Sequence, residues 1–104
     1  MIPTLIFDEI DNGISGVTAS IVAKKLREIS QKHQIICITH LPQIAAMGAT
    51  HYKVYKEDKA DTTVSTMTKL NTDDRVREIA QMLSGSDISE AAISNAKALL
   101  KIKN

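Results

Sequence analysis

The chain has 104 residues, enough for one small domain and too few for two. Hydrophobic residues make up 43% and charged residues 24% of the sequence, as in ordinary globular proteins. The net charge of +1 gives no strong field that would favour direct binding to nucleic acid or a membrane, and an aromatic content of 3% argues against a base-stacking surface.

Cysteine use and the N-terminus give two further expectations. Cys37 is the only cysteine, so no internal disulfide can form; we expect it to be a small core residue in a reducing, cytoplasmic protein. No apolar run approaches membrane-spanning length, and residues 1–4 do not form a signal peptide. A buried strand is predicted within a few residues of Met1, which is unusual for a natural domain, so we expect a piece of a longer protein.

A short apolar run near the N-terminus ends abruptly in two acids. Leu5, Ile6 and Phe7 are followed by Asp8 and Glu9. An unbroken apolar run of this length is typical of a strand buried on both faces of a parallel sheet, and such sheets carry their chemistry just beyond the carboxyl ends of the strands. One carboxylate could hold a hard cation, and the other could orient and deprotonate an attacking water. Alternatively, the acidic pair merely ends the strand and starts a turn.

A turn and a helix are predicted next. Residues 12–16 contain two glycines that can take positive φ, and residues 17–31 have helical periodicity, with Ser15 as the expected N-cap. The apolar positions expected to share one face of this helix are Val17, Ile21, Val22, Leu26 and Ile29.

A second β-branched run, at residues 34–38, ends in Thr39 and His40. Strand, helix and strand over this distance form a βαβ unit with a right-handed crossover. We therefore expect Thr39 and His40 to lie at the same sheet edge as Asp8 and Glu9.

The following segment predicts a short helix and a hairpin. Residues 41–48 have a proline in the first turn of the helix and Gly48 as its expected C-cap. Residues 51–56 and 64–70 alternate between apolar and polar side chains, with residues 57–61 as the exposed turn between them.

Two amphipathic helices are predicted at the end of the chain. Their apolar stripes are Val76, Ile79, Ala80 and Leu83 in the first, and Ala92, Ala96, Leu99 and Leu100 in the second. Asp87 and Glu90 resemble a capping box. Together the elements predict one α/β unit over residues 1–104, with parallel strands in a βαβ crossover, a β-hairpin and two C-terminal helices.

The ordered motifs resemble the head domain of ATP-binding-cassette ATPases, and within them the SMC-related RecN family of bacterial repair and recombination proteins. Leu-Ile-Phe-Asp-Glu at residues 5–9 is similar to Walker B, residues 11–16 to that family's D-loop, and Ile-Thr-His-Leu-Pro-Gln at residues 38–43 to the switch-histidine segment. Residues 82–86 and 96–100 are similar to the end of the family's sequences. The resemblance covers essentially the whole chain and implies the C-terminal lobe of a P-loop NTPase head.

The resemblance also implies roles for individual residues. Asp8 would hold Mg²⁺, through water, and Glu9 would be the base or water-orienting group for attack on the γ-phosphate of ATP. His40 would contact that phosphate. Ser15 and Gly16 would lie at the nucleotide and face a second head across an ATP-sandwiched homodimer, although many cassette proteins carry an aspartate where Ser15 aligns.

Several parts of a cassette ATPase are missing from the sequence. The Walker A loop Gly-x-x-x-x-Gly-Lys-Ser/Thr is absent, because no lysine follows any of the four glycines, and the signature motif, glutamine loop and coiled-coil arm are absent too. Residues 83–86 are similar to a Leu-Ser-Gly-Gly signature, but that motif precedes Walker B in cassette ATPases, and a glycine that ends a helix explains them. We therefore expect this polypeptide alone neither to bind ATP well nor to hydrolyse it.

The function implied by the resemblance is ATP-driven head engagement in DNA double-strand break repair and recombination. The expected partners are the rest of the chain's own head, a second head and, through the full-length protein, DNA, with no membrane. The expected location is the cytoplasm, at the nucleoid. The role with DNA comes from the resemblance alone, since charge and composition do not indicate it.

Two other readings stay open on the sequence. Asp8, Glu9 and Asp11 fit the DExD box of a superfamily-two helicase, although such proteins usually carry a Ser-Ala-Thr motif where residues 38–40 read Ile-Thr-His. A non-catalytic dimerisation module with a decayed site is the other. His40 could also be a surface or capping residue, while His33 and His51 are expected to be solvated or structural, and no Cys/His cluster has zinc-ligand spacing.

Overall fold

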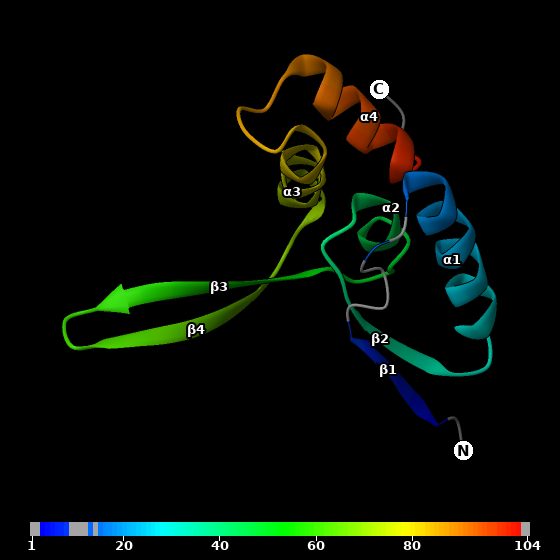
Figure 1. The fold of residues 1–104 in the computed structure, drawn as a ribbon, viewed down its shortest axis with the longest axis horizontal. Coiled ribbons are helices and arrows are strands. Elements are labelled where there is room, and N and C mark those ends of the chain that lie inside the picture. The colour runs from blue at the N-terminus through cyan, green and yellow to red at the C-terminus, as the bar shows by residue number, and fades with distance from the viewer. Residues whose placement is uncertain (1–2, 9–12, 14, 103–104) are drawn as a thin grey trace.

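The computed structural model describes residues 3–8, 13 and 15–102 of the chain. The elements in chain order are β1 (Thr4–Asp8), α1 (Gly16–Ile29), β2 (Gln34–Ile38), α2 (Pro42–Ala45), β3 (Tyr52–Lys59), β4 (Thr62–Lys69), α3 (Thr72–Ser84) and α4 (Glu90–Leu99). Figure 1 shows the helices gathered with β1 and β2, and the β3–β4 hairpin projecting away from them. The predicted α/β class and the predicted order of elements are confirmed.

The two N-terminal strands form a parallel pair joined through α1, as the βαβ prediction requires. Thr4 pairs with Gln34 and Asp8 with Ile38, so the strands run in register over their whole length. One face of this pair packs against α1 and α2, where Phe7 and Ile35 contact a buried cluster formed by Ala19, Ala23, Leu26 and Ile44. The pair therefore has one covered face.

The expectation that the first strand is buried on both faces is wrong for the described part of the chain. Burial alternates along both strands, and the outward side chains Ile6, Ile36 and Ile38 are 67%, 46% and 50% exposed. The reason is that the described residues place helices against one side of the pair and nothing against the other. An apolar sheet face is left open.

Helix α1 begins as predicted, and its predicted apolar face is only partly buried: Leu26 lies in the core cluster and Val22 packs against it. Ser15 is the N-cap, and its side chain accepts a hydrogen bond from the Thr18 backbone N–H. The buried residues are Ala19, Ala23 and Leu26, whereas Val17 and Ile21, expected to be in the core, are 76% and 64% exposed. The alanines pack in one cluster with Ile44, and α1 makes close contact with α2 through this face.

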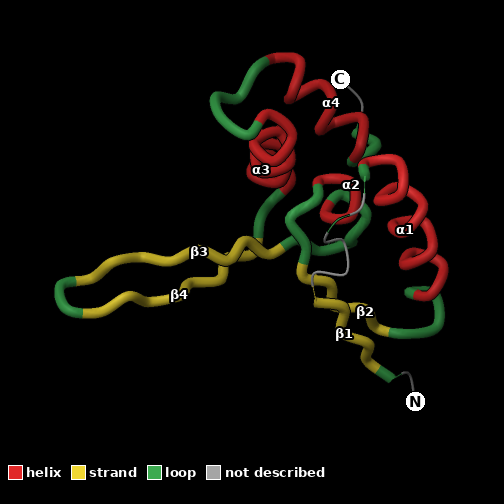
Figure 2. The backbone as a smooth tube through the Cα atoms, viewed as in Figure 1, coloured by secondary structure: helices red, strands yellow, loops and turns green. Residues whose placement is uncertain are grey.

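Helix α2 is a single turn that connects two buried clusters. It contacts both α1 and α3, and it lies between them in Figure 2. Ile44 packs with α1, while Ala46, just after the helix, packs with α3 and α4. The expected C-cap at Gly48 is wrong, because the helix already ends at Ala46 in right-handed conformation.

The β-hairpin is confirmed with longer strands and a tighter turn than predicted. Lys59 pairs with Thr62, so the connection is the two residues Ala60 and Asp61, not residues 57–61. Ala60 takes a φ of 23°, a positive value that few non-glycine residues adopt.

The two C-terminal helices form the larger buried cluster. Its buried members are Ala46, Val76, Ile79, Ala80, Ala92 and Ala96, with Leu83, Leu99 and Leu100 packed against them. Gly85 ends α3 in left-handed conformation with a φ of 72°, in agreement with its assignment as a helix-ending glycine. The expected capping box at Asp87 is wrong: Ser89 is the N-cap of α4 and accepts from the Ala92 N–H at 3.0 Å.

Candidate functional site

The parallel pairing brings Asp8 and His40 to the same edge of the sheet. Asp8 is the last residue of β1 and pairs with Ile38, the last residue of β2, and His40 follows two residues later. The backbone therefore places these two residues as the sequence predicted. Glu9 lies outside the described residues.

The chemistry at this edge suits a hydrated cation and a phosphate. Asp8 and His40 are both exposed, so a ligand can reach them. A carboxylate oxygen is a hard ligand of the kind that Mg²⁺ prefers, and Mg²⁺ usually keeps several waters, so one carboxylate fits the predicted water-mediated contact. Within the part of the chain that the structure describes, no three His, Cys, Asp or Glu residues gather as a metal cluster.

The turn after β2 is held by a local hydrogen bond. The Thr39 hydroxyl oxygen accepts from the Leu41 backbone N–H at 3.0 Å, which fixes the chain as it leaves the strand and enters α2. The segment that carries His40 is thus anchored on both sides by regular structure.

Ser15 and Gly16 lie at the N-terminus of α1. The Ser15 side chain is exposed, donates to the Thr18 hydroxyl at 3.2 Å and caps the helix. If Ser15 also makes the predicted contact across a dimer, it has both a structural and an interface role. A Cβ atom at Gly16 would lie 3.1 Å from Nε2 of Gln43. The sequence assigned Gln43 to the switch-histidine segment but predicted no role for it. Its contact with α1 is visible only in three dimensions.

Arg75 on α3 holds the end of α2. Its Nη2 donates to the carbonyl oxygens of Ala45 at 3.0 Å and Ala46 at 3.3 Å, and to that of Gly48. Burial lowers the pKa of Arg75. Sequence reasoning missed this contact, since residues about thirty positions apart carry no local signal for it.

His51 lies beside this contact. Burial lowers the pKa of His51, the positive charge of Arg75 lowers it further, and the negative charge of Glu78 opposes both effects. Nδ1 of His51 is buried and has no hydrogen-bond partner. This environment agrees with the expectation of a structural histidine.

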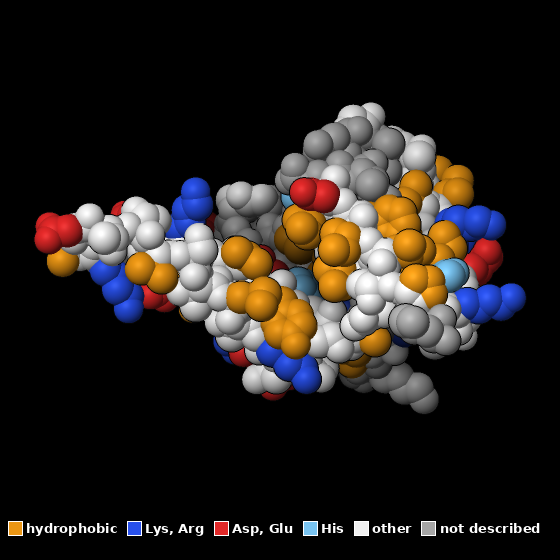
Figure 3. Space-filling model, turned by 90° about the horizontal axis from the view of Figure 1, so that it is seen from below, with side chains coloured by type: hydrophobic (Ala, Val, Ile, Leu, Met, Phe, Trp, Pro, Cys, Tyr) orange, Lys and Arg blue, Asp and Glu red, His pale blue; other side chains and the backbone are white. Residues whose placement is uncertain are grey.

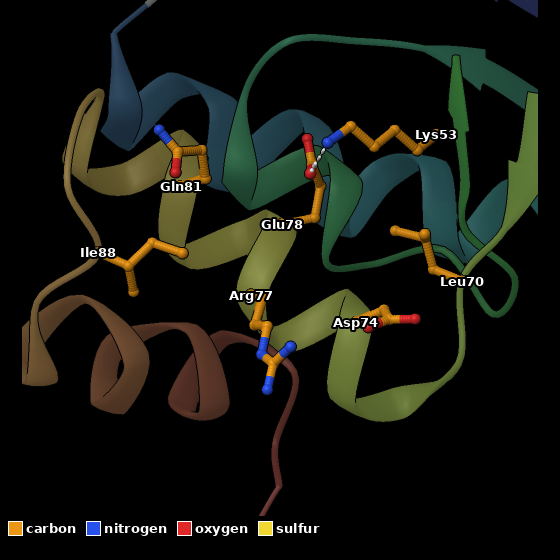
Figure 4. Close-up of a pocket in the computed structure, with 7 residues that line it drawn as sticks. All are labelled: Lys53, Leu70, Asp74, Arg77, Glu78, Gln81 and Ile88. Carbon is orange, nitrogen blue, oxygen red and sulfur yellow. Dashed lines mark ion pairs between the residues drawn. The ribbon is translucent and has the colours of Figure 1, made fainter. Parts of the chain in front are cut away.

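A shallow groove of about 370 Å³ lies between the base of the hairpin and α3 (Figure 4). Its lining residues are Lys53, Leu70, Asp74, Arg77, Glu78, Gln81 and Ile88. Lys53 and Glu78 form an ion pair across it at 2.8 Å. Because none of the predicted site residues lines this groove, it is separate from the β1–β2 edge.

The molecule shows apolar side chains on the face seen in Figure 3, over the hairpin and over the body beside it. The exposed apolar residues of the hairpin include Tyr52, Val54 and Met67. None of the helices described is both long and apolar enough to cross a membrane.

Comparison with known proteins gives relatives over nearly the whole chain. The chain is 48% identical over 98 residues to the DNA repair protein RecN of Vibrio cholerae, covering 94% of this chain and 18% of that protein. It is 48% identical over 101 residues to RecN of Haemophilus influenzae and 40% identical over 100 residues to RecN of Bacillus subtilis, covering 97% and 96% of this chain. The chain thus spans 17–18% of the length of these relatives.

A solved structure has the same fold. It comes from a study of ATP-driven dimerization and DNA-stimulated activation of SMC ATPases, and it superimposes with a TM-score of 0.67 at 24% identity, over 82% of this chain and 50% of that one. No protein-family model matches the chain.

Proposed function

This chain is a homologue of the DNA repair protein RecN with the fold of an SMC ATPase, and from that premise we propose that it supplies the Walker B, D-loop and switch-histidine part of an ATPase head. The observation that supports this most directly is the register of β1 with β2, which puts Asp8 and His40 at one sheet edge. Ligands bind beyond the carboxyl ends of parallel strands in folds of this class.

The proposed roles follow the chemistry of each side chain. Asp8 holds Mg²⁺ through water, and bound Mg²⁺ neutralises the charge that develops on the phosphates. Glu9 orients and deprotonates the attacking water. His40 donates to the γ-phosphate, and Ser15 with Gly16 faces the nucleotide and a second head in a homodimer.

The remaining parts of the proposed ATPase head come from outside this segment. The phosphate-binding loop and the signature motif are not in the sequence, so we propose that the rest of the same head and a second head supply them. DNA double-strand break repair and recombination are proposed for the complete protein, acting in the cytoplasm at the nucleoid. The relatives reported above favour this reading over a DExD helicase.

The test is Glu9→Gln in a RecN-length protein that contains this segment. Removing the general base should leave ATP bound but unhydrolysed, with turnover down by about 10²–10⁴-fold. Dimer lifetime, measured by sedimentation with ATP, should rise. Asp61→Asn in the hairpin turn is the matched control and should leave both unchanged, whereas wild-type turnover in Glu9→Gln would remove Glu9 from this role.

A further inference from the structure

Gln43 connects two parts of the proposed site that are separate in the sequence. It lies in the single turn of α2, three residues after His40, and is partly buried. Helix α2 packs against α1, whose first residue is Gly16. Gln43 is thus close in sequence to His40 and close in space to the start of α1.

The contact between Gln43 and Gly16 is tight. A Cβ atom added at Gly16 would lie 3.1 Å from Nε2 of Gln43, closer than an ordinary van der Waals contact. Ser15, the N-cap of α1, is the adjacent residue. The side-chain amide therefore packs directly against the backbone that follows Ser15, and a Cβ at Gly16 would require the amide to shift by a few tenths of an ångström.

The oxygen of the same amide is unsatisfied. Oε1 of Gln43 is buried and has no hydrogen-bond partner. Buried side-chain acceptors in folded proteins are nearly always hydrogen-bonded, so an unpaired one calls for an explanation. A state of the complete head in which an N–H or O–H group reaches this oxygen would be favoured over the one seen here.

We propose that Gln43 is a positioning residue: it holds the start of α1, with Ser15 and Gly16, against the segment that carries His40. The amide oxygen of Gln43 accepts a hydrogen bond when the head engages nucleotide. This inference rests on the proposed function. A shift of His40 on contact with phosphate would move α2, and the amide would transmit that shift to the N-terminus of α1. Gln43 touches neither nucleotide nor metal in this role.

The experiment uses a RecN-length protein that contains this segment, with the single variants Gln43→Ala, Gln43→Met and Gly16→Ala and the double variant Gly16→Ala/Gln43→Ala. Each single variant should lower kcat by about tenfold to a hundredfold, as expected for an ångström-scale misplacement, with an unchanged thermal midpoint. The two Gln43 variants should also leave KM for ATP unchanged. Gln43→Met keeps the side-chain volume, so it separates loss of the amide from loss of packing.

The double variant gives the distinctive result. Because Gln43→Ala removes the group that a Cβ at Gly16 would meet, adding Gly16→Ala to it should change kcat by less than about twofold, which is strong non-additivity for residues in contact. Gln31→Ala, an exposed glutamine after α1, is the matched control and should behave as wild type. Multiplicative effects in the double variant, or wild-type kcat in Gln43→Met, would overturn the proposal.

The same series separates this inference from the proposed function. If Glu9→Gln abolishes turnover while the Gln43 variants turn over normally, only the role of Gln43 fails. If Glu9→Gln turns over normally, the proposed function itself fails.

Discussion

The most informative single residue outside the proposed site is His51. Its lowered pKa means that the folded chain binds a proton at this position less readily than the unfolded chain does. Between the lowered folded pKa and the unfolded value of about 6.5, the unfolded state binds more protons, so stability rises with pH there and is lost as pH falls.

We therefore expect the chain to lose stability on acidification below about pH 6.5 and the variant His51→Gln to lose less. The neutral amide cannot acquire a charge beside Arg75, which explains the flatter profile. Urea unfolding between pH 5 and 8 measures this. His33→Gln is the matched control: if it flattened the change of stability with pH more than His51→Gln does, another histidine would dominate. Parallel profiles for wild type and His51→Gln would contradict the assignment.

At the scale of elements, one side chain joins the two halves of the fold. Arg75 belongs to α3, and the carbonyls that it binds lie at the end of α2. Among the described residues, α2 is the only element that contributes to both buried clusters. The last carbonyls of a helix have no partner within the helix, so a donor from outside satisfies them. The orientation of α2, and with it the segment after His40, depends on this contact.

Arg75→Met should destabilise the chain by about 2 kcal/mol, since hydrogen bonds from a charged donor contribute about 1.5–3 kcal/mol and the carbonyls would lose their partner. Methionine keeps most of the side-chain volume, so lost packing contributes little. Arg77→Met, on the exposed side of the same helix, is the control and should change stability by less than about 0.5 kcal/mol. Equal denaturation midpoints for Arg75→Met and wild type would show that the contact contributes nothing.

Local signals predicted the elements better than their partners. The βαβ unit, the hairpin, the Ser15 cap and the helix end at Gly85 were all predictable, because each depends on residues close together in the chain. The packing face of α1 was predicted only in part: Leu26 is in the core, whereas Val17 and Ile21 are exposed and alanines take their place. Tertiary contacts such as those of Arg75 and Gln43 leave no local pattern at all.

For the whole molecule, the open face of β1 and β2 links the fold to the proposed function. Ile6, Ile36 and Ile38 expose apolar surface on the strands whose ends carry Asp8 and precede His40. Parallel sheets are normally covered on both faces, and the relatives are several times longer than this chain. We propose that the rest of the same head covers this face, which would also bring the missing phosphate-binding groups beside the acids.

If the rest of the head supplies the phosphate-binding groups, the isolated 104-residue chain should not bind ATP. A carboxylate and an imidazole at an exposed edge can act on a phosphate, but they cannot hold a triphosphate that carries several negative charges without a cradle of backbone N–H groups and a lysine. Isothermal titration with MgATP should therefore give no measurable heat at micromolar chain concentration, and phosphate release should equal the background. Asp8→Asn, which removes one negative charge from the edge, is the control: it should leave the absence of binding unchanged, since repulsion by Asp8 is not the cause. Micromolar affinity in the isolated chain would mean that the nucleotide is held by residues of this segment, and the proposed dependence on the rest of the head would be wrong.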